Sequence, residues 1–486
     1  MIKKFLVKAK SLKPKLITDT VSAKYAGQPL GEGDCAVIDF GTHLVGTVSL
    51  KLSYIGSPPD APVFVRLKFC EHKSEIDEDT SDYRGWISKS WIQEEFVHID
   101  DIPSTVRLPR RYAVRYIKID VISISSKFRL VLEGASVDAT TSACQNVALC
   151  GRDDRAKKID EVALRTLRNC MQCEFEDGPK RDRRLWLGDL RLQALANYKT
   201  YKNYDLVKRC LYLFAGASDK NGNIPACVFT HSRVIPDDTF MFDYSLLFIP
   251  TLLDYYAETG DKSTALDLLP LALRQIEIAK ESFDKDVVRD SDKLGWCFID
   301  WSLELNKQCS AQGVYIFCEK CAAKLCTLLE KDASELYDDV KKKTDAAISA
   351  FFDEKLGLFA SGKDRQLSYA SNIWMCLSGV FNEEKCRDIL INLEKTDSIR
   401  PVTPYLYHHY IQALTACGEL SKAEKMMYDY WGGMVEAGAD TFWELYDPKN
   451  PNASPYGSRS VNSYCHAWSC TPSYFIRKYF SGEKDD

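Results

Sequence analysis

Charged residues are concentrated in one short stretch, residues 176–189, which also contains an aromatic side chain, Trp186. The stretch has four acids and four bases, with Gly178-Pro179 near its start and Gly188 just before its last acid. Gly and Pro are typical of turns, and helix-period apolar patterns lie on both sides, so we expect a loop between two helices. An aromatic ring among carboxylates is typical of a sugar site, because the ring stacks on a pyranose while acids bind hydroxyls or move protons. The alternative is a structural loop of ion pairs, since such networks resemble active sites.

Four later segments combine aromatic residues with acids or a histidine. They are residues 236–240, 296–301 (with Trp296, Asp300 and Trp301), 438–447 (with Trp443 and Glu444) and 463–468 (with His466). Each segment alone is explained by core packing beside a surface acid. Their recurrence at the ends of consecutive helical hairpins favours a shared site.

Paired carboxylates are the groups that glycosidic bond cleavage requires. One protonates the leaving oxygen, and the other acts as nucleophile or activates water. The acid is kept protonated by apolar neighbours or by other carboxylates. Asp177, Asp182 and Asp189 share one loop, where mutual repulsion would raise one pKa, but Arg181 and Arg183 act in the opposite direction and the sequence leaves the balance open. Glu444, far away in sequence and next to Trp443, is the natural second carboxylate.

Composition excludes several functional classes. The 486 residues carry a formal net charge of only −5 and no long basic run, which argues against nucleic acid as a partner. We find no apolar run long enough for a membrane span. The first ten residues contain lysines where a signal peptide needs an apolar run, so we expect a cytoplasmic location. The 18 cysteines include two pairs with CxxC spacing, Cys170/Cys173 and Cys318/Cys321, but both pairs fall in helical stretches. Reduced core thiols explain them better than zinc, and we expect no metal and no cofactor.

The pattern of apolar residues divides the chain into two parts. Up to about residue 140 the period is close to two, with strands near 36–40, 46–52, 63–69, 95–99, 116–121 and 128–133, which indicates a β-sandwich. Helical periodicity then predicts helices near 155–174, 189–201, 204–215, 240–259, 262–282, 311–329, 333–352, 368–380, 382–394, 403–417, 420–435 and 462–479. Twelve helices make six hairpins, which suggests an (α/α)6 toroid with a cavity roofed by the long connections. The predicted domains are therefore an all-β domain over 1–145 and an all-α domain over 146–486.

Two segments and the order of the domains resemble a known family. Residues 177–189 are similar to the acidic signature of glycoside hydrolase family 78, the α-L-rhamnosidases, and Gly438-Ala439-Asp440-Thr441-Phe442-Trp443-Glu444 is similar to its second signature. Residues 463–469 resemble the His-containing last helix of that family. The resemblance covers roughly residues 35–480. It implies a six-hairpin glycosidase that inverts the anomeric configuration.

The resemblance also implies roles for individual residues. Asp182 is expected to be the general acid and Glu444 the general base. Many members carry a Glu where Arg183 stands, and the spacing from Asp177 to Asp189 matches members whose acid occupies the place of Asp182. Sugar-binding residues are expected to be Asp177, Arg181, Trp186, Asp189, Trp296, Asp300, Trp301, Trp443 and His466. Accessory β-domains of larger members have no counterpart, which favours small or trimmed rhamnosides as substrates.

Two other readings stay open. The first is a six-hairpin glycosidase or lyase acting on another sugar, because loops rather than the scaffold set specificity. A lyase would use Arg181 or Arg183 near a uronate carboxylate. The second is a non-catalytic carbohydrate-binding homologue in which Arg183 has abolished catalysis. A homo-oligomer is also compatible with the sequence.

Overall fold

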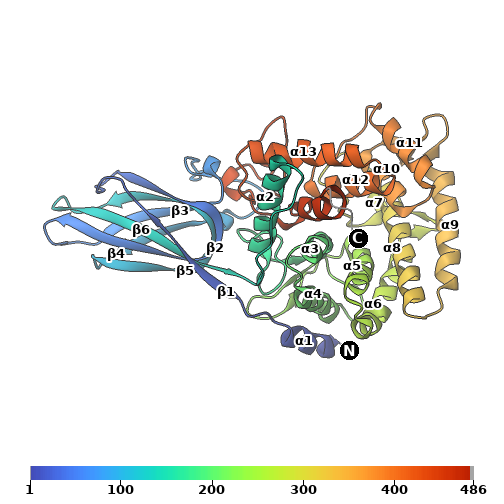
Figure 1. Ribbon diagram of the computed structural model, residues 1–486, viewed down its shortest axis with the longest axis horizontal. Coiled ribbons are helices and arrows are strands. Elements are labelled where there is room, and N and C mark those ends of the chain that lie inside the picture. Colours follow the sequence, from blue (N-terminus) through green and yellow to red (C-terminus); the bar gives the residue numbers. More distant parts are fainter. Residues whose placement is uncertain (1, 452, 482–486) are drawn as a thin grey trace.

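The computed structural model describes residues 2–451 and 453–481. Figure 1 shows an elongated molecule with a β-part at one end and a larger helical part at the other. No described helix combines the length and hydropathy required to cross a bilayer.

The β-part is built from six antiparallel strands that form one hydrogen-bonded sheet in the order β1-β6-β2-β5-β3-β4. They are β1 (Ile17–Lys24), β2 (Cys35–Gly56), β3 (Val63–Cys70), β4 (Glu94–Ile99), β5 (Ser104–Ser123) and β6 (Phe128–Thr141). The alternation that predicted strands places one face inward, and Ile38, Val48 and Ile117 share a single apolar cluster. Strand β2 pairs with β5 along most of its length, and a register shift between Asp39 and Leu44 interrupts this pairing.

Helix α1 (Ile2–Ser11) was not expected, and the prediction of strand periodicity from the start of the chain was wrong there. Phe5 and Ala9, one helical turn apart, are buried. The Phe5 ring lies 6.0 Å from the ring of Tyr212 in α4 (Tyr204–Ala217), and Lys8 forms an ion pair with Asp267. This first helix therefore packs on the helical part, as Figure 1 shows.

Eleven of the twelve predicted helical segments are present among the described residues, with bounds that differ by a few residues. They are α2 (Asp154–Cys170), α3 (Leu187–Lys199), α4, α5 (Phe242–Thr259), α6 (Lys262–Lys280), α8 (Gln308–Leu328), α9 (Ser334–Phe351), α10 (Tyr369–Ser378), α11 (Glu383–Leu393), α12 (Pro404–Ala416) and α13 (Leu420–Glu436). Short elements lie in the connections: β7 (Leu185–Trp186), β8 (Cys227–Phe229), β9 (Ile235–Pro236), β10 (Phe283–Asp284), β11 (Val287–Val288), α7 (Ser291–Leu294), β12 (Phe352–Asp353), β13 (Leu358–Ser361) and β14 (Gln366–Leu367).

The predicted helix over 462–479 was wrong in its first half. The amide of Glu444 donates to the carbonyl of Ser463 at 3.0 Å, and that of His466 donates to Phe442 at 2.8 Å. These two hydrogen bonds join Ser463 and His466 to residues 442–444 in place of helical hydrogen bonds, and the chain bends at residues 464–465. Short helical turns follow at Ala467–Ser469, α14 (Pro472–Phe475) and Ile476–Phe480.

The helices of the second part contact one another in a cyclic order. Contacts run from α3 to α5, α8, α10 and α12, and then through residues 467–469 back to α3. Helices α4, α6, α9, α11, α13 and α2 pack outside this ring. The loops at one end of the ring bring together segments that are far apart in sequence.

Candidate active site

An inner cavity of about 460 Å³ opens at the end of the helical part that faces the β-part. Its lining includes nine of the eleven predicted site residues: Asp177, Arg181, Asp182, Trp186, Asp189, Trp296, Trp301, Glu444 and His466. These residues come from the connections after α2, α7 and α13 and from the first turn of α3. The loops of separate hairpins thus meet at one place, as the toroid hypothesis requires.

The acid loop, residues 176–186, closes on itself between α2 and α3. The amide of Asp177 donates to the carbonyl of Arg184 at 2.9 Å, and the Arg184 amide donates to Asp177 Oδ1 at 3.0 Å. Gly178 permits the tight turn, because a Cβ there would lie 2.7 Å from the carbonyl oxygen of Arg181. Asp177 is therefore both part of the loop frame and part of the cavity wall.

Asp177 and Asp189 are buried carboxyls whose environment favours the protonated form. Burial raises the pKa of Asp177 well above its usual range, and the Asp182 and Asp189 carboxylates raise it further. Burial also raises the pKa of Asp189 well above its usual range, and the negative charge of Glu444 raises it further. Asp189 Oδ1 has no hydrogen-bond partner among the described residues. It can therefore hydrogen-bond a sugar hydroxyl in the cavity.

Asp182 differs from its neighbours in the acid loop. It is half-buried, and no hydrogen bond or ion pair joins its side chain to any described residue. Its carboxyl is thus available to a ligand that enters the cavity.

Glu444 is held by two donors. The Arg181 guanidinium contacts Glu444 Oε2, and the Tyr456 hydroxyl donates to Glu444 Oε1 at 2.8 Å. Arg181 also donates to the Tyr456 hydroxyl at 2.9 Å and lies over the Tyr456 ring at 4.1 Å. The three side chains fix one another, so the position of the Glu444 carboxylate is well defined.

His466 lies between the two groups of carboxylates. Its Nδ1 is 3.6 Å from Asp189 Oδ1, and its Nε2 is 3.8 Å from Glu444 Oε1. Burial and the charge of Arg181 lower the pKa of His466 well below its usual range. A neutral imidazole has one donor and one acceptor nitrogen, and both suit sugar hydroxyls.

The structure places the other two predicted residues outside the inner cavity. Asp300 accepts from the Thr403 amide at 3.1 Å and hydroxyl at 2.6 Å and from the Val402 amide at 2.8 Å, so it anchors the start of α12. It lines a neighbouring outer cavity of about 630 Å³. Trp443 is buried, with its ring 5.2 Å from those of His72 and Tyr464, and it does not line the inner cavity.

Aromatic side chains that the sequence reading missed complete the walls. They include Tyr244, Phe298, Tyr456 and Trp468. The Trp468 ring lies 4.3 Å from His466 and 5.7 Å from Phe298, and Tyr244 lies 6.2 Å from Trp186. Trp468 lies two residues after His466, and this spacing was the available signal. Tyr244 belongs to α5, and in the sequence an aromatic residue of an apolar helix indicates core packing rather than a site.

The β-part also contributes to the inner cavity. Trp86, Ile87, Ser88 and Trp91, all from the connection between β3 and β4, line it. Glu78 in the same connection accepts hydrogen bonds from the amides of Arg459 and Ser460 at 2.9 and 2.6 Å. The connection is thus fastened to residues 458–460 of the helical part, which places Trp86 at the cavity.

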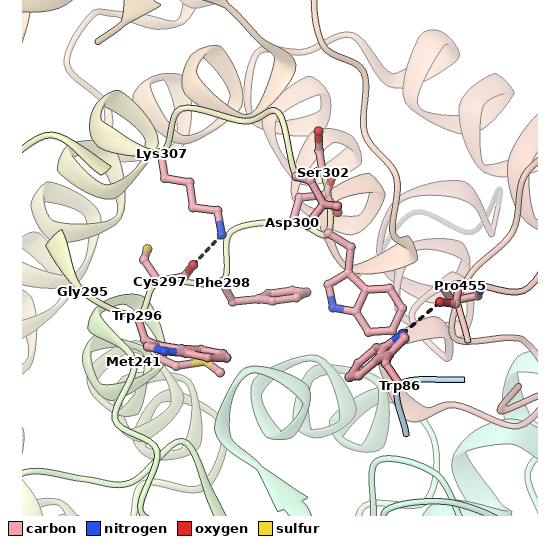
Figure 2. A pocket seen from close by; sticks show the side chains of 12 residues that line it. Trp86, Met241, Gly295, Trp296, Cys297, Phe298, Asp300, Ser302, Lys307 and Pro455 are labelled. Atoms are coloured by element: carbon pink, nitrogen blue, oxygen red, sulfur yellow. Dashed lines mark hydrogen bonds between the residues drawn. The ribbon is translucent and has the colours of Figure 1, made fainter. Parts of the chain in front are cut away.

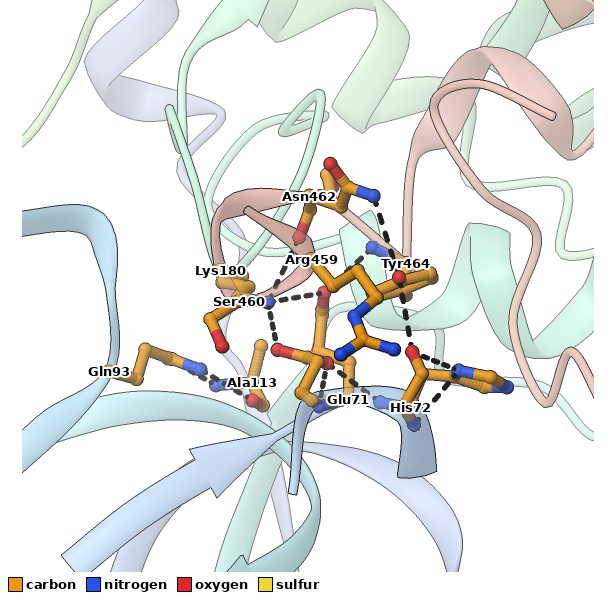
Figure 3. Close-up of polar contacts among 12 residues, drawn as sticks. Glu71, His72, Gln93, Ala113, Lys180, Arg459, Ser460, Asn462 and Tyr464 are labelled. Carbon is orange, nitrogen blue, oxygen red and sulfur yellow. Dashed lines mark hydrogen bonds and ion pairs between the residues drawn. The ribbon is translucent and has the colours of Figure 1, made fainter. Parts of the chain in front are cut away.

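A buried charge network joins the β-part to the acid loop (Figure 3). Lys180 donates to Glu75 at 2.5 Å and to the Asn462 carbonyl at 2.9 Å, and it lies 3.7 Å from Glu71. Burial raises the pKa of Glu75 to about 7, partly offset by Lys180. Glu71 in turn accepts from the Tyr464 amide at 2.8 Å. The network fixes Lys180, which immediately precedes Arg181, and so supports the acid loop on the side of the β-part.

Arg183, which stands where many members of the resembled family carry Glu, points away from the cavity. It donates to the Pro179 carbonyl at 2.7 Å and to the Arg111 carbonyl of β5 at 2.9 Å. Its φ of 58° is in the left-handed region. The replacement therefore adds a contact between the two parts and leaves the cavity carboxyls unobstructed.

One group of side chains within residues 2–451 and 453–481 has metal-ligand spacing: Glu174, Glu176 and His231. Arg111 pairs with Glu176 at 2.8 Å, and Arg209 lies 3.8 Å from Glu174. These guanidinium groups already balance both carboxylates. The group lies outside the lining of the inner cavity.

Comparison with protein families gives two matches. Residues 8–139 match the glycosyl hydrolase family 78 alpha-rhamnosidase N-terminal domain, and residues 149–480 match the bacterial alpha-L-rhamnosidase 6 hairpin glycosidase domain. The chain belongs to glycoside hydrolase family 78. The predicted family is thereby confirmed, together with a mostly-β N-terminal region and a six-hairpin glycosidase domain. A search of the curated proteins found no match.

Solved structures of rhamnosidases are similar to this glycoside hydrolase. A rhamnosidase from Klebsiella oxytoca with rhamnose bound is 45% identical, with a TM-score of 0.94 and coverage of 98% of each chain. The family 78 rhamnosidase of Bacillus sp. GL1 is 19% identical, with a TM-score of 0.77, and the match covers 93% of this chain and 47% of that one. A Streptomyces avermitilis α-L-rhamnosidase complexed with L-rhamnose is 17% identical, with a TM-score of 0.68 and coverage of 96% and 44%. The latter two show a shared fold.

Proposed function

We propose that this family 78 hydrolase is an inverting α-L-rhamnosidase that removes terminal α-L-rhamnose from small glycosides or oligosaccharides. The observation that carries the proposal is the 45% identity, over 98% of both chains, to a rhamnosidase described with rhamnose bound. The inner cavity supports it, because it combines acids, a neutral histidine and aromatic walls at about 460 Å³, a volume suited to one sugar and part of its aglycone.

Asp182 acts as the general acid and Glu444 as the general base in this proposal. Asp182 is the acid-loop carboxyl without a described partner, so it can approach the glycosidic oxygen. Glu444, fixed by Arg181 and Tyr456, takes a proton from a water that attacks the anomeric carbon on the opposite face. Inversion requires the two carboxyls to lie roughly 6.5–9.5 Å apart, which leaves room for that water.

The remaining cavity groups bind the sugar. Asp189 and His466 offer unpaired polar atoms to its hydroxyls, namely Oδ1 and Nδ1. Asp177 contributes to the same wall and Arg181 holds Glu444, while Trp186, Trp296 and Trp301 provide ring faces. Asp300 contributes through the position of α12 rather than through a free carboxylate.

The alternatives have less support. Of the two arginines predicted for a uronate lyase, Arg181 is engaged by Glu444 and Arg183 does not line the inner cavity, whereas Arg184 does line it. A binding-only homologue was suggested because Arg183 replaces a Glu that many family members carry. The Arg183 side chain does not line the inner cavity, so it does not cover the carboxyls there. A different sugar stays possible on the same scaffold.

The finer architecture is also a proposal. The cyclic contacts of the helices support an (α/α)6 toroid. The single apolar cluster on the inner face of the six-stranded sheet supports a sandwich-like β-domain. The domain limits 1–145 and 146–486, the cytoplasmic location and the oligomeric state remain predictions.

The test is release of p-nitrophenol from p-nitrophenyl α-L-rhamnopyranoside, beside a panel of other p-nitrophenyl sugars. We expect turnover of the rhamnoside, with β-L-rhamnose as the first product seen by proton NMR. Turnover of another sugar alone would overturn the substrate. An α-anomer as first product would overturn inversion, and binding without turnover of any sugar would favour the non-catalytic reading.

A further inference from the structure

The outer cavity is joined to the inner cavity through common walls. Both are lined by Trp86, Met241, Trp296, Phe298 and Trp301. A ligand with its sugar among the acids of the inner cavity therefore has room to extend its other end into the outer cavity. At about 630 Å³, this space is large enough for a bulky aglycone.

The mouth of the outer cavity exposes large apolar side chains. Trp86, Trp296 and Leu303 are 74%, 70% and 103% exposed, respectively. Figure 2 shows Trp86 and Trp296 on opposite sides of the cavity, with Phe298 between them. Exposed apolar surface that gathers around a cavity is typical of a ligand-binding groove.

Several polar side chains of these walls are occupied by the protein, whereas the Ser302 hydroxyl and the Trp296 indole have no hydrogen-bond partner among the described residues. Lys307 donates to the Cys297 carbonyl at 2.7 Å, and the Trp86 indole donates to the Pro455 carbonyl at 3.0 Å (Figure 2). Asp300 is used by the start of α12. A second sugar would bury several hydroxyls here with few partners, and each unpaired hydroxyl lowers affinity. The cavity offers ring faces instead.

We propose that the outer cavity binds an apolar, aromatic aglycone rather than a second sugar, and that Trp86 of the β-part determines this specificity. The inference rests on the proposed rhamnosidase function. Trp86 lies 5.3 Å from the ring of Tyr456, whose hydroxyl binds Glu444. Trp86 of the outer cavity is thus in contact with Tyr456, the residue that helps to hold the general base Glu444.

The test compares kcat/KM for methyl α-L-rhamnoside, benzyl α-L-rhamnoside and α-L-rhamnopyranosyl-(1→6)-glucose. Benzyl alcohol and the glucose 6-hydroxyl are both primary alcohols, so the difference between these two substrates reports mainly on aglycone contacts. We expect the benzyl rhamnoside to be preferred by about tenfold over the disaccharide, as burial of one ring predicts.

Substitutions assign the effect to Trp86. Trp86→Ala is expected to lose about tenfold more kcat/KM on the benzyl than on the methyl rhamnoside, and Trp86→Phe to retain most of the preference. Phe96→Ala is the matched control, because it removes an aromatic side chain that is 61% exposed elsewhere on the β-part. Preference for the disaccharide, or equal losses on all three substrates in Trp86→Ala, would overturn the inference.

A binding measurement separates this inference from the proposed function. If no rhamnoside is cleaved, the proposed function fails, and calorimetric titration with 1-naphthol still tests the outer cavity. Saturable binding that weakens about tenfold in both Trp86→Ala and Trp296→Ala would support an apolar aromatic site. No binding, or binding unchanged in both variants, would overturn it.

Discussion

The inner and outer cavities share walls but differ in their buried polar atoms. In the inner cavity, Asp189 Oδ1 and His466 Nδ1 are buried without hydrogen-bond partners among the described residues. In the outer cavity, Lys307, Asp300 and the Trp86 indole are all engaged by the protein. Unpaired buried polar atoms destabilise a fold, so their presence on one side only marks where a polar ligand completes the structure.

The contacts that hold the walls of the two cavities also differ, since one set is charged and the other is aromatic. The acid loop rests on the buried charges of Lys180, Glu75 and Glu71. The walls of the outer cavity rest on ring contacts such as Trp301 with Tyr456 at 5.7 Å. Changes in charge should therefore affect sugar chemistry first, and changes in ring size should affect the aglycone.

The largest expected effect is that of Glu444→Gln. Loss of the base should lower kcat on p-nitrophenyl α-L-rhamnoside by about 10³-fold, within the range typical of general base catalysis. Binding of 1-naphthol to the outer cavity should be unchanged. Glu436→Gln, at an exposed glutamate paired with Arg155, is the control. Near wild-type kcat in Glu444→Gln would remove Glu444 from the mechanism.

Asp182→Asn and Asp189→Asn separate the general acid from a sugar ligand. Without its acid, the enzyme should lose about 10²-fold in kcat on methyl α-L-rhamnoside but far less on the p-nitrophenyl rhamnoside, whose leaving group needs no proton. Asp189→Asn should reduce kcat/KM on both substrates alike. If Asp189→Asn showed the dependence on the leaving group instead, the two roles would be exchanged.

Lys180→Met tests the support of the inner cavity. The substitution leaves Glu75 and Glu71 without their cation, and loss of one partner of a buried ion pair typically costs about 3–5 kcal/mol. Urea unfolding should report this decrease in the free energy of unfolding. Lys341→Met, at a side chain that is 77% exposed, should have no effect. A double variant, Lys180→Met with Glu75→Gln, should recover part of the loss. Full stability of the single variant would contradict the assigned network.

The smallest expected effect concerns pH and His72. Burial lowers the pKa of His72 to about 4, and the charges of Lys73, Arg115 and Lys180 act in the same direction. The unfolded chain, with a His pKa near 6.5, binds this proton first, so the free energy of unfolding decreases as pH falls from 6.5 to 4. The difference in pKa corresponds to at most about 3 kcal/mol.

His72→Asn removes this titration and keeps a side chain that can cap the following turn. Its unfolding free energy should therefore fall less steeply between pH 6.5 and 4 than that of the wild type. His98→Asn, at an exposed histidine, is the control. Parallel curves for wild type and His72→Asn would refute the assignment.

Much of the inner cavity could be predicted because its residues stand out by type. Acids beside Gly, Pro and Trp are unusual in a solvated turn, and helical periodicity located the loops that carry them. Trp443 was misplaced because adjacent side chains diverge: Glu444 faces the cavity, and Trp443 packs against His72 and Tyr464. Asp300 lies in the outer cavity instead, because its carboxylate binds the backbone amides of Val402 and Thr403, more than 100 residues later in the chain, and sequence periodicity does not show such a pairing.

The contribution of the β-part could not be predicted from periodicity. The connection between β3 and β4 has little regular structure, and Trp86 contacts Pro455, 369 residues later in the chain. Helix α1 was missed because the lysines of the first ten residues were used only to predict the location of the protein, whereas Phe5 and Ala9 form a narrow apolar face. Such pairings depend on how two parts meet, and sequence periodicity describes only one element at a time.

The packing of α1 has a mechanical consequence. The backbone leaves the helical part after α1 and returns to it at α2, so two covalent connections join the parts. Arg209 of α4 contacts the Ala9 carbonyl on the first route, and Asn203, just before α4, donates to the Ser142 carbonyl on the second route at 3.0 Å. A body attached by one connection can turn in any direction about it, whereas two connections restrict rotation to the axis that joins them. The β-part is therefore held to the helical part more tightly than by a single linker.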